Sequence, residues 1–361
     1  MSLAPAAIGF RVLRGYYLVR RGITGSHRPA AARMRTRRHA FYRHAWQRAA
    51  ERAGLTFREV GGDLAEVSRS GRQLCVFPGS GALDDTATLQ RAGDKPTVYR
   101  LLAERGVPVP RHVVLDGERL PRLSDCLNSL TPPLVVKPAR NAGSGAGVTT
   151  NVMTAAELRH AVAWARAFGP RVLVEAQVDG ACYRVLVIDG EVADVVLRRR
   201  PTVTGDGRST IRRLIALENR HRLSCGMQRA QVLLRRDPDL IRTLASQGLD
   251  LASRPAAGRI VEVKRVINDN CAAENEASNG RLCAAALQTA CTAAAALGLR
   301  LAGIDLLCAD PAVPLAGSGG AVIDVNATPG FYYHYHRVGP AFPLAERLLE
   351  KVLPGEVRHA I

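Results

Sequence analysis

The sequence predicts an α+β, or mixed α/β, fold. Short apolar strands separated by tight turns dominate from about residue 134 onward, among them a hairpin with an Asp189-Gly190 turn. Helical stretches alternate with these strands, but without the regular strand–helix–strand order of a doubly wound sheet. Hydrophobic residues make up 47% of the 361 residues, which is enough to bury a core.

The first third of the chain is predicted to contain two helices and one strand. Apolar residues recur at helical spacing around residues 40–53, and residues 74–78 form a strand candidate. A second helix is expected to begin near Asp94 and to end at Gly106, and prolines follow in an extended segment.

Strands predominate beyond residue 130. Thr154 and Glu157 have the spacing of a capping box, which predicts a helix that continues to Phe168. Two further helical regions are expected, at 211–251 and 282–297. The predicted strands are residues 133–137, 147–152, 171–175, the hairpin 183–197, and two last strands within 301–310 and 321–326.

Positive charge is concentrated at the N-terminus. The formal net charge is +18, and residues 1–50 hold eleven arginines and no acidic residue. An arginine-preferring genome together with a basic N-terminal arm explains this pattern. A patch for nucleic acid or an anionic membrane and a transit peptide are the alternatives. We expect no nucleic-acid partner.

The cysteines and the apolar runs bear on the compartment. None of the eight cysteines has the spacing of a zinc site, which favours free thiols in a reducing compartment. No apolar run reaches the roughly 20 residues of a membrane span. We therefore expect a cytoplasmic protein without a membrane segment.

Two aspartates and an asparagine lie on the last two strand candidates. Asp324 and Asn326 are two residues apart, so they share one face of a strand, while Asp305 lies inside the apolar run LAGIDLLC. Carboxylate and amide oxygens on neighbouring strands would suit Mg²⁺, with Mn²⁺ as an alternative metal. Pairing of the two aspartates with arginines is the other interpretation.

A strand that ends on Lys137 runs into a loop that contains Gly143, Ser144, Gly145 and Gly147. Backbone N–H groups of such a loop can bind phosphate oxygens, and the lysine adds a point charge. The loop is not a Walker loop, because the GK[ST] sequence is missing. It is not a Rossmann fingerprint, because a strand follows it. A hairpin loop without a ligand is the alternative.

Three more charged residues are candidates for the same site. Lys95 begins the helix near residue 94. Glu175 ends a buried strand, where a crossing between two lobes would offer backbone groups to an adenine. Arg184 lies on an otherwise apolar strand, and an ordinary salt bridge within a sheet is its alternative role.

In this order, the motifs resemble the ATP-grasp superfamily. Several stretches are similar to the ATP-grasp region of cyanophycin synthetases, and the combination of GDGRSTI with a downstream PAAG is more specific than a lone glycine pattern. The similarity covers about residues 90–340. The stretches are VTGDGRSTIRRLI (203–215), QGLDLASRPAAG (247–258), the AGID strand and SGGAVIDVNATPG (318–330).

This resemblance implies an ATP-grasp fold, in which two α+β lobes clamp the nucleotide behind a small N-terminal region. It also implies roles for single residues. The nucleotide-binding residues would be Lys95, Lys137, Gly143, Ser144, Gly145, Gly147, Glu175, Val178 and Asp179, the metal ligands Asp305, Asp324 and Asn326, and the residues that steady the transferred phosphate Arg184, Lys264 and Asn268. The expected domains are a basic arm at 1–38, a small region at 39–92, and an ATP-grasp domain at 93–355 with lobes at about 93–175 and 176–355.

The sequence departs from the family pattern around the expected substrate pocket. Cys182 stands where an acidic residue often holds the ribose, so Asp179 is a candidate substitute. Residues 270–273 read NCAA where STGG is usual. Tyr332 replaces an arginine, whereas His334 matches a family histidine. These last two are the substrate candidates, in an aromatic segment that would form a pocket wall or pack as core.

The resemblance implies an ATP- and Mg²⁺-dependent ligase that joins a carboxylate to an amine through an acyl phosphate, forming an amide or peptide bond. Both substrates would be small molecules, at least one of them an amino acid, and a homo-oligomer is compatible with the sequence. Two alternatives remain open. One is an ATP-grasp kinase of small molecules, and the other is a non-catalytic protein that binds polyanions through its arginine-rich arm.

Overall fold

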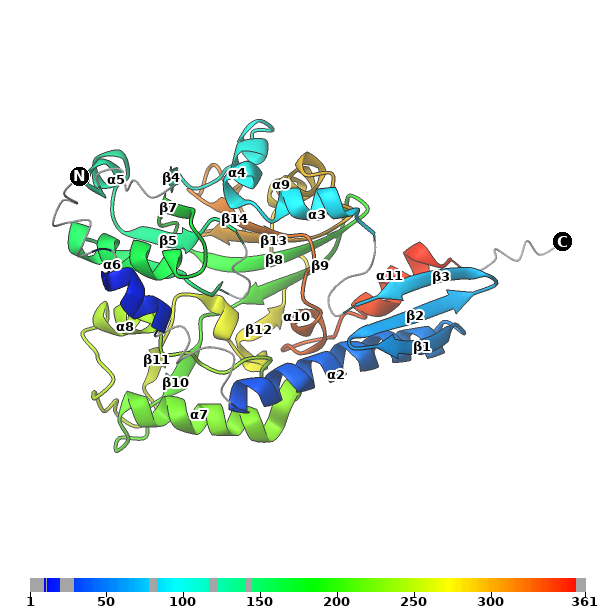
Figure 1. Cartoon of the computed structure of the whole chain (residues 1–361), viewed down its shortest axis with the longest axis horizontal. Helices are drawn as coiled ribbons and strands as arrows, with labels where there is room; N and C mark the ends of the chain where they lie inside the picture. Colours follow the sequence, from blue (N-terminus) through cyan, green and yellow to red (C-terminus); the bar gives the residue numbers. More distant parts are fainter. Residues whose placement is uncertain are drawn as a thin grey trace.

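The computed structural model describes residues 10, 12–19, 29–77, 83–116, 123–140 and 145–354. Two larger β-sheets, each covered by helices on its outer face, lie next to each other, and a helix with a small three-stranded sheet extends to one side (Figure 1). This arrangement confirms the predicted α+β class. None of the described helices is long and apolar enough to cross a lipid bilayer.

The first lobe is a four-stranded sheet in the order β4-β7-β5-β6. Side chains alternate between its faces, so Leu134 and Val136 of β5 pack against α6, while Val135 and Lys137 point to the opposite face. The capping box at Thr154 is confirmed and begins α6. The elements are β4 (His112–Leu115), β5 (Leu134–Pro138), β6 (Thr149–Val152) and β7 (Val172–Ala176), with α5 (Leu123–Ser129) and α6 (Ala155–Arg166).

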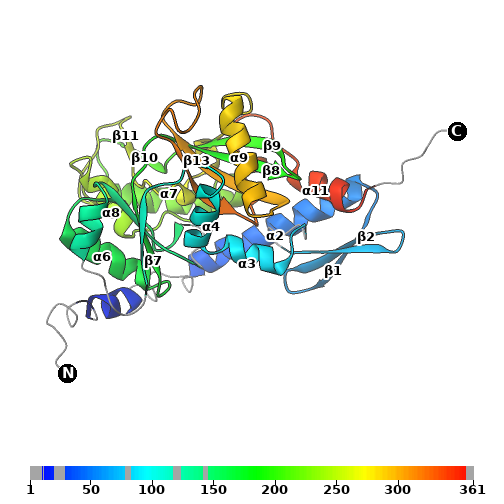
Figure 2. The same cartoon turned by 90° about the horizontal axis from the view of Figure 1, so that it is seen from above.

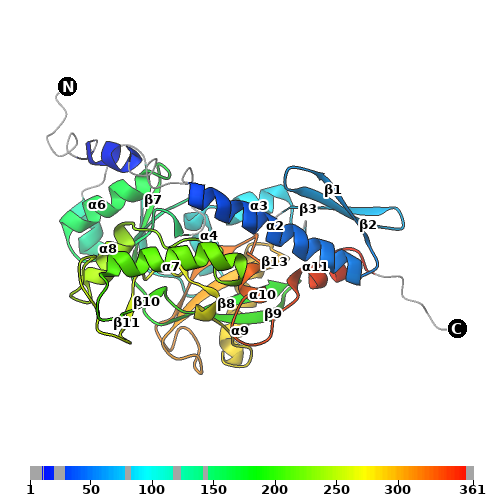
Figure 3. The same ribbon diagram turned by 90° about the horizontal axis from the view of Figure 1, so that it is seen from below.

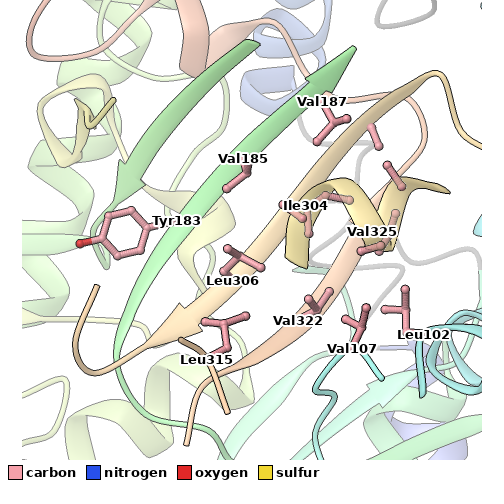
Figure 4. Close-up of a cluster of buried hydrophobic side chains, with 14 of the residues drawn as sticks. Leu102, Val107, Tyr183, Val185, Val187, Ile304, Leu306, Leu315, Val322 and Val325 are labelled. Atoms are coloured by element: carbon pink, nitrogen blue, oxygen red, sulfur yellow. The ribbon is translucent and has the colours of Figure 1, made fainter. Parts of the chain in front are cut away.

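The second lobe is a five-stranded sheet in the order β12-β9-β8-β13-β14. One face packs against α9 and α4 in the largest core of the protein; Figure 4 shows Tyr183, Val185 and Val187 of β8 beside Ile304 of β13 in this cluster. The elements are α4 (Lys95–Ala103), β8 (Ala181–Ile188), β9 (Glu191–Arg198), β12 (Asn275–Ala277), α9 (Ala284–Ala296), β13 (Leu301–Cys308) and β14 (Ala321–Asn326).

The predicted hairpin of the second lobe is confirmed. Asp189 and Gly190 connect β8 to β9 with φ angles of 50° and 81°. Both values are positive, as a tight two-residue turn between antiparallel strands requires.

A segment inserted between β9 and β12 has an apolar cluster of its own. Its helices pack on a two-stranded sheet, and Ile211, Leu240 and Val261 belong to its core. Figure 3 shows α7 along the outside of this insert. The elements are β10 (Thr202–Thr204), α7 (Ile211–Cys225), η2 (Gly226–Gln228), α8 (Pro238–Ala245), β11 (Ile260–Glu262), η3 (Ile267–Asp269) and η4 (Ala272–Glu274).

The N-terminal region is joined to the second lobe by a shared core. Trp46 of α2 packs with Phe331 and with Leu348 of α11, and the same cluster includes Leu186 of β8. Figure 2 shows β1 and β2 projecting beyond α2. The elements are α2 (Pro29–Arg52), β1 (Thr56–Gly61), β2 (Leu64–Arg69), β3 (Arg72–Val76), α3 (Thr86–Ala92), α10 (Tyr332–Tyr335) and α11 (Leu344–Val352).

The N-terminal region also differs most from the sequence-based prediction. The helix predicted around 40–53 begins at Pro29, so the expected arm boundary at residue 38 falls within α2. The hairpin of β1 and β2 was not predicted, because β1 is almost wholly exposed and β2 buries only the short alternation of Ala65 and Val67.

Candidate functional site

A cavity of about 800 Å³ lies between the inner faces of the two larger sheets. That volume is in the range of small-molecule sites in proteins. The first lobe contributes Val135 and Lys137 of β5 and Glu175 of β7, and the second lobe contributes residues of β8, β9, β13 and β14. The cavity is therefore the place where side chains from both lobes meet.

Lys137 is buried at the wall formed by the first lobe and has three partners. Its Nζ lies 2.9 Å from Glu175 Oε1, 2.9 Å from the hydroxyl oxygen of Tyr99 and 3.1 Å from the carbonyl oxygen of Ile323. The Tyr99 hydroxyl in turn lies 3.0 Å from Glu175 Oε2. Burial first, and then the charges of Glu175 and Asp324, raise the pKa of Tyr99 well above its usual value, so Tyr99 stays protonated.

Lys95 approaches the same cavity from α4. Asp94 caps this helix by accepting a hydrogen bond from the backbone N–H of Thr97. Lys95, the next residue, forms an ion pair with Asp324 of the second lobe and lines the cavity. The side chain of Lys95 therefore connects helix α4 to strand β14.

The two predicted carboxylates lie directly opposite each other. Asp305 of β13 pairs with Asp324 of β14 in the antiparallel register, and Gly303 pairs with Asn326. Cross-strand partners have Cβ atoms roughly 5 Å apart. Asp305, Asp324 and Asn326 all line the cavity, as their positions on one face of the strands predict.

Arginines occupy the oxygens of Asp305. Arg184 of β8 donates from Nε at 2.6 Å and from Nη2 at 2.8 Å, and Nη1 of Arg198 lies 3.3 Å from Asp305 Oδ1. Burial raises the pKa of Asp305, but the charges of Arg184 and Arg198 outweigh it and leave the pKa below its usual value. Asp305 is therefore ionised inside the protein.

Among the described residues, no three His, Cys, Asp or Glu side chains cluster in a way that would hold a metal ion. The donors for a hard cation are thus two carboxylates and the amide of Asn326, and each carboxylate is also paired with a cationic side chain.

The described part of the glycine loop packs tightly against the second lobe. Gly145 has φ +69°, and a Cβ atom there would lie 2.4 Å from Val266 Cγ1 and 3.1 Å from Asn268 Oδ1. Gly147 has φ +78°, and its Cβ would lie 2.6 Å from Pro138. Only glycine fits at these positions. Gly145 and Asn268 both line the cavity, whereas Gly143 and Ser144 lie outside the described residues.

The crossing between the lobes runs along the cavity at Val178, which lines it. Asp179 is 70% exposed and pairs with Arg265, which also lines the cavity. Cys182 lines the cavity too, and burial raises its pKa to about 12, so its thiol stays protonated. The carboxylate of Glu175 is bound by Lys137 and Tyr99, so it orients the lysine.

Lys264 lies outside the cavity lining. It is fully buried, and its Nζ lies 2.6 Å from Asp237 and 2.9 Å from Asp269. Although burial opposes it, the charges of Asp237 and Asp269 raise the pKa of Lys264. This lysine supports the segment that leads to Asn268, and its ammonium group does not line the cavity.

Tyr332 and His334 also lie outside the cavity lining. Both are fully buried in and around α10, where the Tyr332 hydroxyl donates to the carbonyl oxygen of Arg229 at 2.9 Å. His334 Nδ1 lies 2.6 Å from Asp194 Oδ2. The aromatic segment packs as core, which is one of the two interpretations of its sequence.

Two residues that bear on the cavity, Tyr99 and Arg198, were not predicted from the sequence. Tyr99 lies four residues after Lys95, a spacing that places both on one face of α4 and offers a signal. Arg198 lines the cavity at the end of β9. Its position depends on a register shift in the hairpin, which the sequence does not reveal.

Comparisons with known proteins agree with this architecture. Residues 101–206 match the family model described as D-ala D-ala ligase C-terminus. The chain is 30% identical to a cyanophycin synthetase of Trichormus variabilis over 248 residues, 68% of this chain and 27% of that protein. It is 29% identical to the glutathione biosynthesis bifunctional protein GshAB of Streptococcus mutans, over 72% of this chain and 35% of that protein.

A solved structure shares the fold. A bifunctional glutathione synthetase from Pasteurella multocida superimposes on 87% of this chain with a TM-score of 0.56 and 20% identity, and the match covers 43% of that protein. The chain thus spans about a quarter to a third of the length of the curated relatives it matches. The matched family model, the sequence relatives and the shared fold together confirm the predicted resemblance to ATP-grasp ligases.

Proposed function

We propose that this protein is an ATP-dependent ligase that joins a carboxylate to an amine and forms an amide or peptide bond. The proposal rests on one observation above all. Lys95 and Lys137 meet Asp324 and Asn326 around a single cavity between two lobes of the ATP-grasp fold. Cations beside carboxylate ligands are the groups that a magnesium nucleotide requires.

The donors present fit Mg²⁺ bound together with a nucleotide, because Mg²⁺ is commonly held by one or two carboxylates plus substrate phosphates. Asp305, Asp324 and Asn326 supply oxygen donors from one face of two adjacent strands. Mn²⁺ accepts the same donors. When bound, the metal would neutralise charge on the phosphate oxygens.

The residues of the chain have distinct tasks in the proposed reaction. Lys137, oriented by Glu175 and Tyr99, and Lys95 would bind phosphate oxygens. The glycine loop at Gly145 would cover the phosphates with backbone N–H groups and exclude water. Arg184 would hold Asp305 in place. No nucleophile from the protein is needed, because the substrate carboxylate accepts the phosphate and the amine then displaces it.

Small molecules are the substrates that we propose, at least one of them an amino acid. The matched relatives are named as a cyanophycin synthetase and a glutathione biosynthesis protein. The cavity of about 800 Å³ has room for a nucleotide and a compact ligand.

The test is a screen for ADP and phosphate release with Mg·ATP and a mixture of the twenty protein amino acids, followed by mass spectrometry of the products. We expect ADP formation that depends on the amino acids and yields a product with a new amide bond. Lys137→Ala should abolish it, because Lys137 is a buried cation at the cavity wall. A phosphorylated product without an amide would identify a kinase instead, and ADP formation by the variant at the parent rate would contradict the assignment.

A further inference from the structure

Arg198 has a position that the proposed reaction leaves unexplained. It is 2% exposed, lies at the end of β9 and lines the cavity. In the sheet it is the cross-strand partner of Cys182 on one side and of Asn275 on the other. Arg198 therefore belongs to the wall of the cavity.

Two of its donors are unused. Nε and Nη2 of Arg198 are buried and have no hydrogen-bond partner among the residues that the structure describes. Within the described part of the chain, the hydrogen bonds of this side chain come from Nη1 alone, which lies 3.3 and 3.5 Å from the two carboxylate oxygens of Asp305. Leaving buried donors unpaired costs about 1–3 kcal/mol each. A ligand with oxygen acceptors would remove that cost.

The other arginines around the cavity are engaged. Arg184 uses Nε and Nη2 on Asp305. Arg199 pairs with Glu276 and Arg200 with Glu262. Arg265 pairs with Asp179. Arg198 differs because it is buried and still has two donors to offer.

The guanidinium group of Arg198 lies over the ring of Tyr333. The central carbon of Arg198 lies 4.2 Å from the centroid of this ring. Stacking of this kind covers a face of the guanidinium and leaves its in-plane N–H donors for hydrogen bonds. The two unpaired donors, Nε and Nη2, lie on one edge of the guanidinium, and a planar, bidentate acceptor such as a carboxylate matches that edge.

Charge is ordered across the sheet. On one face lie Asp324 of β14, Asp305 of β13, Arg184 of β8 and Arg198 of β9, on four consecutive strands. Neighbouring strands are about 4.8 Å apart, so β9 lies roughly 14 Å from β14. The acidic end suits a metal and the nucleotide phosphates, and the basic end suits a second anion beyond them.

We propose that Arg198 binds an oxyanion at the β8–β9 end of the cavity, and that this oxyanion is the carboxylate of the acid substrate. The anion site follows from the geometry alone, whereas its assignment to a substrate carboxylate rests on the proposed function. The γ-phosphate of the nucleotide is the alternative oxyanion for this site, because it offers the same kind of oxygen acceptors.

Binding experiments on the full chain test the site without a known substrate. Mg·ADP and Mg·AMPPNP are titrated by calorimetry, and inorganic phosphate is then titrated into the Mg·ADP complex as an oxyanion probe. For Arg198→Met we expect unchanged Kd values for both nucleotides and a phosphate affinity at least about tenfold weaker, the effect of losing a charge-assisted hydrogen bond. Arg198→Lys should lose less affinity, because it keeps the charge.

Arg281→Met is the matched control. Arg281 is exposed and pairs with Glu276 outside the cavity lining. The Arg281→Met variant should therefore bind phosphate with the affinity of the parent protein. Selective weakening of Mg·AMPPNP relative to Mg·ADP in Arg198→Met would keep the anion site and assign it to the γ-phosphate. Unchanged phosphate and nucleotide binding in both Arg198 variants would overturn the proposal.

The screen with the amino-acid mixture distinguishes a failure of this anion-site proposal from a failure of the proposed ligase function. If the parent forms no amide but Arg198→Met still loses phosphate affinity, the ligase assignment fails and the anion site stands. If the parent forms an amide and Arg198→Met forms it with unchanged KM for the acid, the carboxylate assignment fails while the ligase stands.

Discussion

The hydroxyl of Tyr99 lies at the centre of the contacts that hold Lys137. It lies 2.9 Å from Lys137 Nζ and 2.8 Å from the carbonyl oxygen of Ile323. We expect Tyr99→Phe to weaken Mg·AMPPNP binding about tenfold, since Lys137 loses one of three partners, and to lower the unfolding free energy by about 1–3 kcal/mol. Calorimetry and urea unfolding measure the two effects.

Tyr42→Phe is the control for that prediction. The Tyr42 hydroxyl accepts a hydrogen bond from the backbone N–H of Phe331 at 3.2 Å, outside the cavity lining. This variant should lose stability on the same scale and bind the nucleotide like the parent. If Tyr99→Phe also bound like the parent, the hydroxyl would have no part in positioning Lys137.

Asp324 is the more exposed of the two opposed carboxylates and pairs with Lys95. Asp324→Asn removes a charge next to the phosphates, so we expect turnover to fall at least ~10²-fold and its dependence on Mg²⁺ concentration to weaken. Steady-state rates across a Mg²⁺ series provide the measurement. Asp189→Asn, at the remote β8–β9 turn, is the control, and a normal Mg²⁺ response in Asp324→Asn would refute a metal site here.

Single residues also show what the sequence could and could not predict. Alternation along the strand was sufficient to place Asp324 and Asn326 on one face, and the cross-strand register then places Asp305 opposite Asp324. It was not sufficient for Arg198. The Asp189-Gly190 turn pairs Ile188 with Glu191, and without a bulge it would place Leu197 opposite Cys182; the register shift places Arg198 there instead.

Among the structural elements, the glycine loop allows a test of whether the close approach of Gly145 to Val266 matters for nucleotide binding. Gly145→Ala would introduce a Cβ atom 2.4 Å from Val266 Cγ1, in addition to the strain of a positive φ angle. We expect the loop to move away from Val266 and Asn268, which should weaken Mg·AMPPNP binding at least about tenfold. Calorimetry measures the Kd of Mg·AMPPNP for the variant and the parent.

Gly190→Ala separates the clash from the backbone strain. Gly190 also has a positive φ angle, but nothing lies within 4 Å of its Cβ position. This variant should lose about 1 kcal/mol of stability and keep its nucleotide affinity. Equal nucleotide affinities of the two variants would show that the contact of the loop with Val266 does not matter.

Elements with local signals were predicted well, and elements defined by burial were not. The capping box at Thr154 and the Asp189-Gly190 turn depend on neighbouring residues alone, and both are present. The aromatic segment at α10 has no such signal, because aromatic residues suit a pocket wall and a core equally well. Which of the two it forms depends on packing around Phe331 by α11 and by α2, and α2 lies near the other end of the chain.

At the scale of the molecule, the two lobes and the N-terminal region are linked through the second sheet. One face of that sheet is divided. Asp305 and Arg198 line the cavity, while Leu186 and Leu301 pack under Trp46 of α2. The fold of two lobes was predictable from the order of motifs, whereas this attachment of α2 was not, since it depends on contacts with Phe331 and Leu348 at the other end of the chain.

The attachment predicts the outcome of two truncations. Deletion of residues 1–28 leaves α2 complete, whereas deletion of residues 1–38 removes its first turns, with the buried Met34 and with Arg37, which donates to the carbonyl oxygen of Leu223. Losing a buried methionine costs about 2–5 kcal/mol. We expect the longer deletion to be less stable than the shorter one by at least about 2 kcal/mol in urea unfolding. Contacts with residues 10 and 12–19 are lost in both deletions, so they cancel in this comparison.

Mg·AMPPNP binding at low temperature should be the same for both deletions, since neither reaches the residues that line the cavity. Equal unfolding free energies would show that residues 29–38 behave as a detached arm, as the sequence suggested, and that α2 is anchored only from Tyr42 onward.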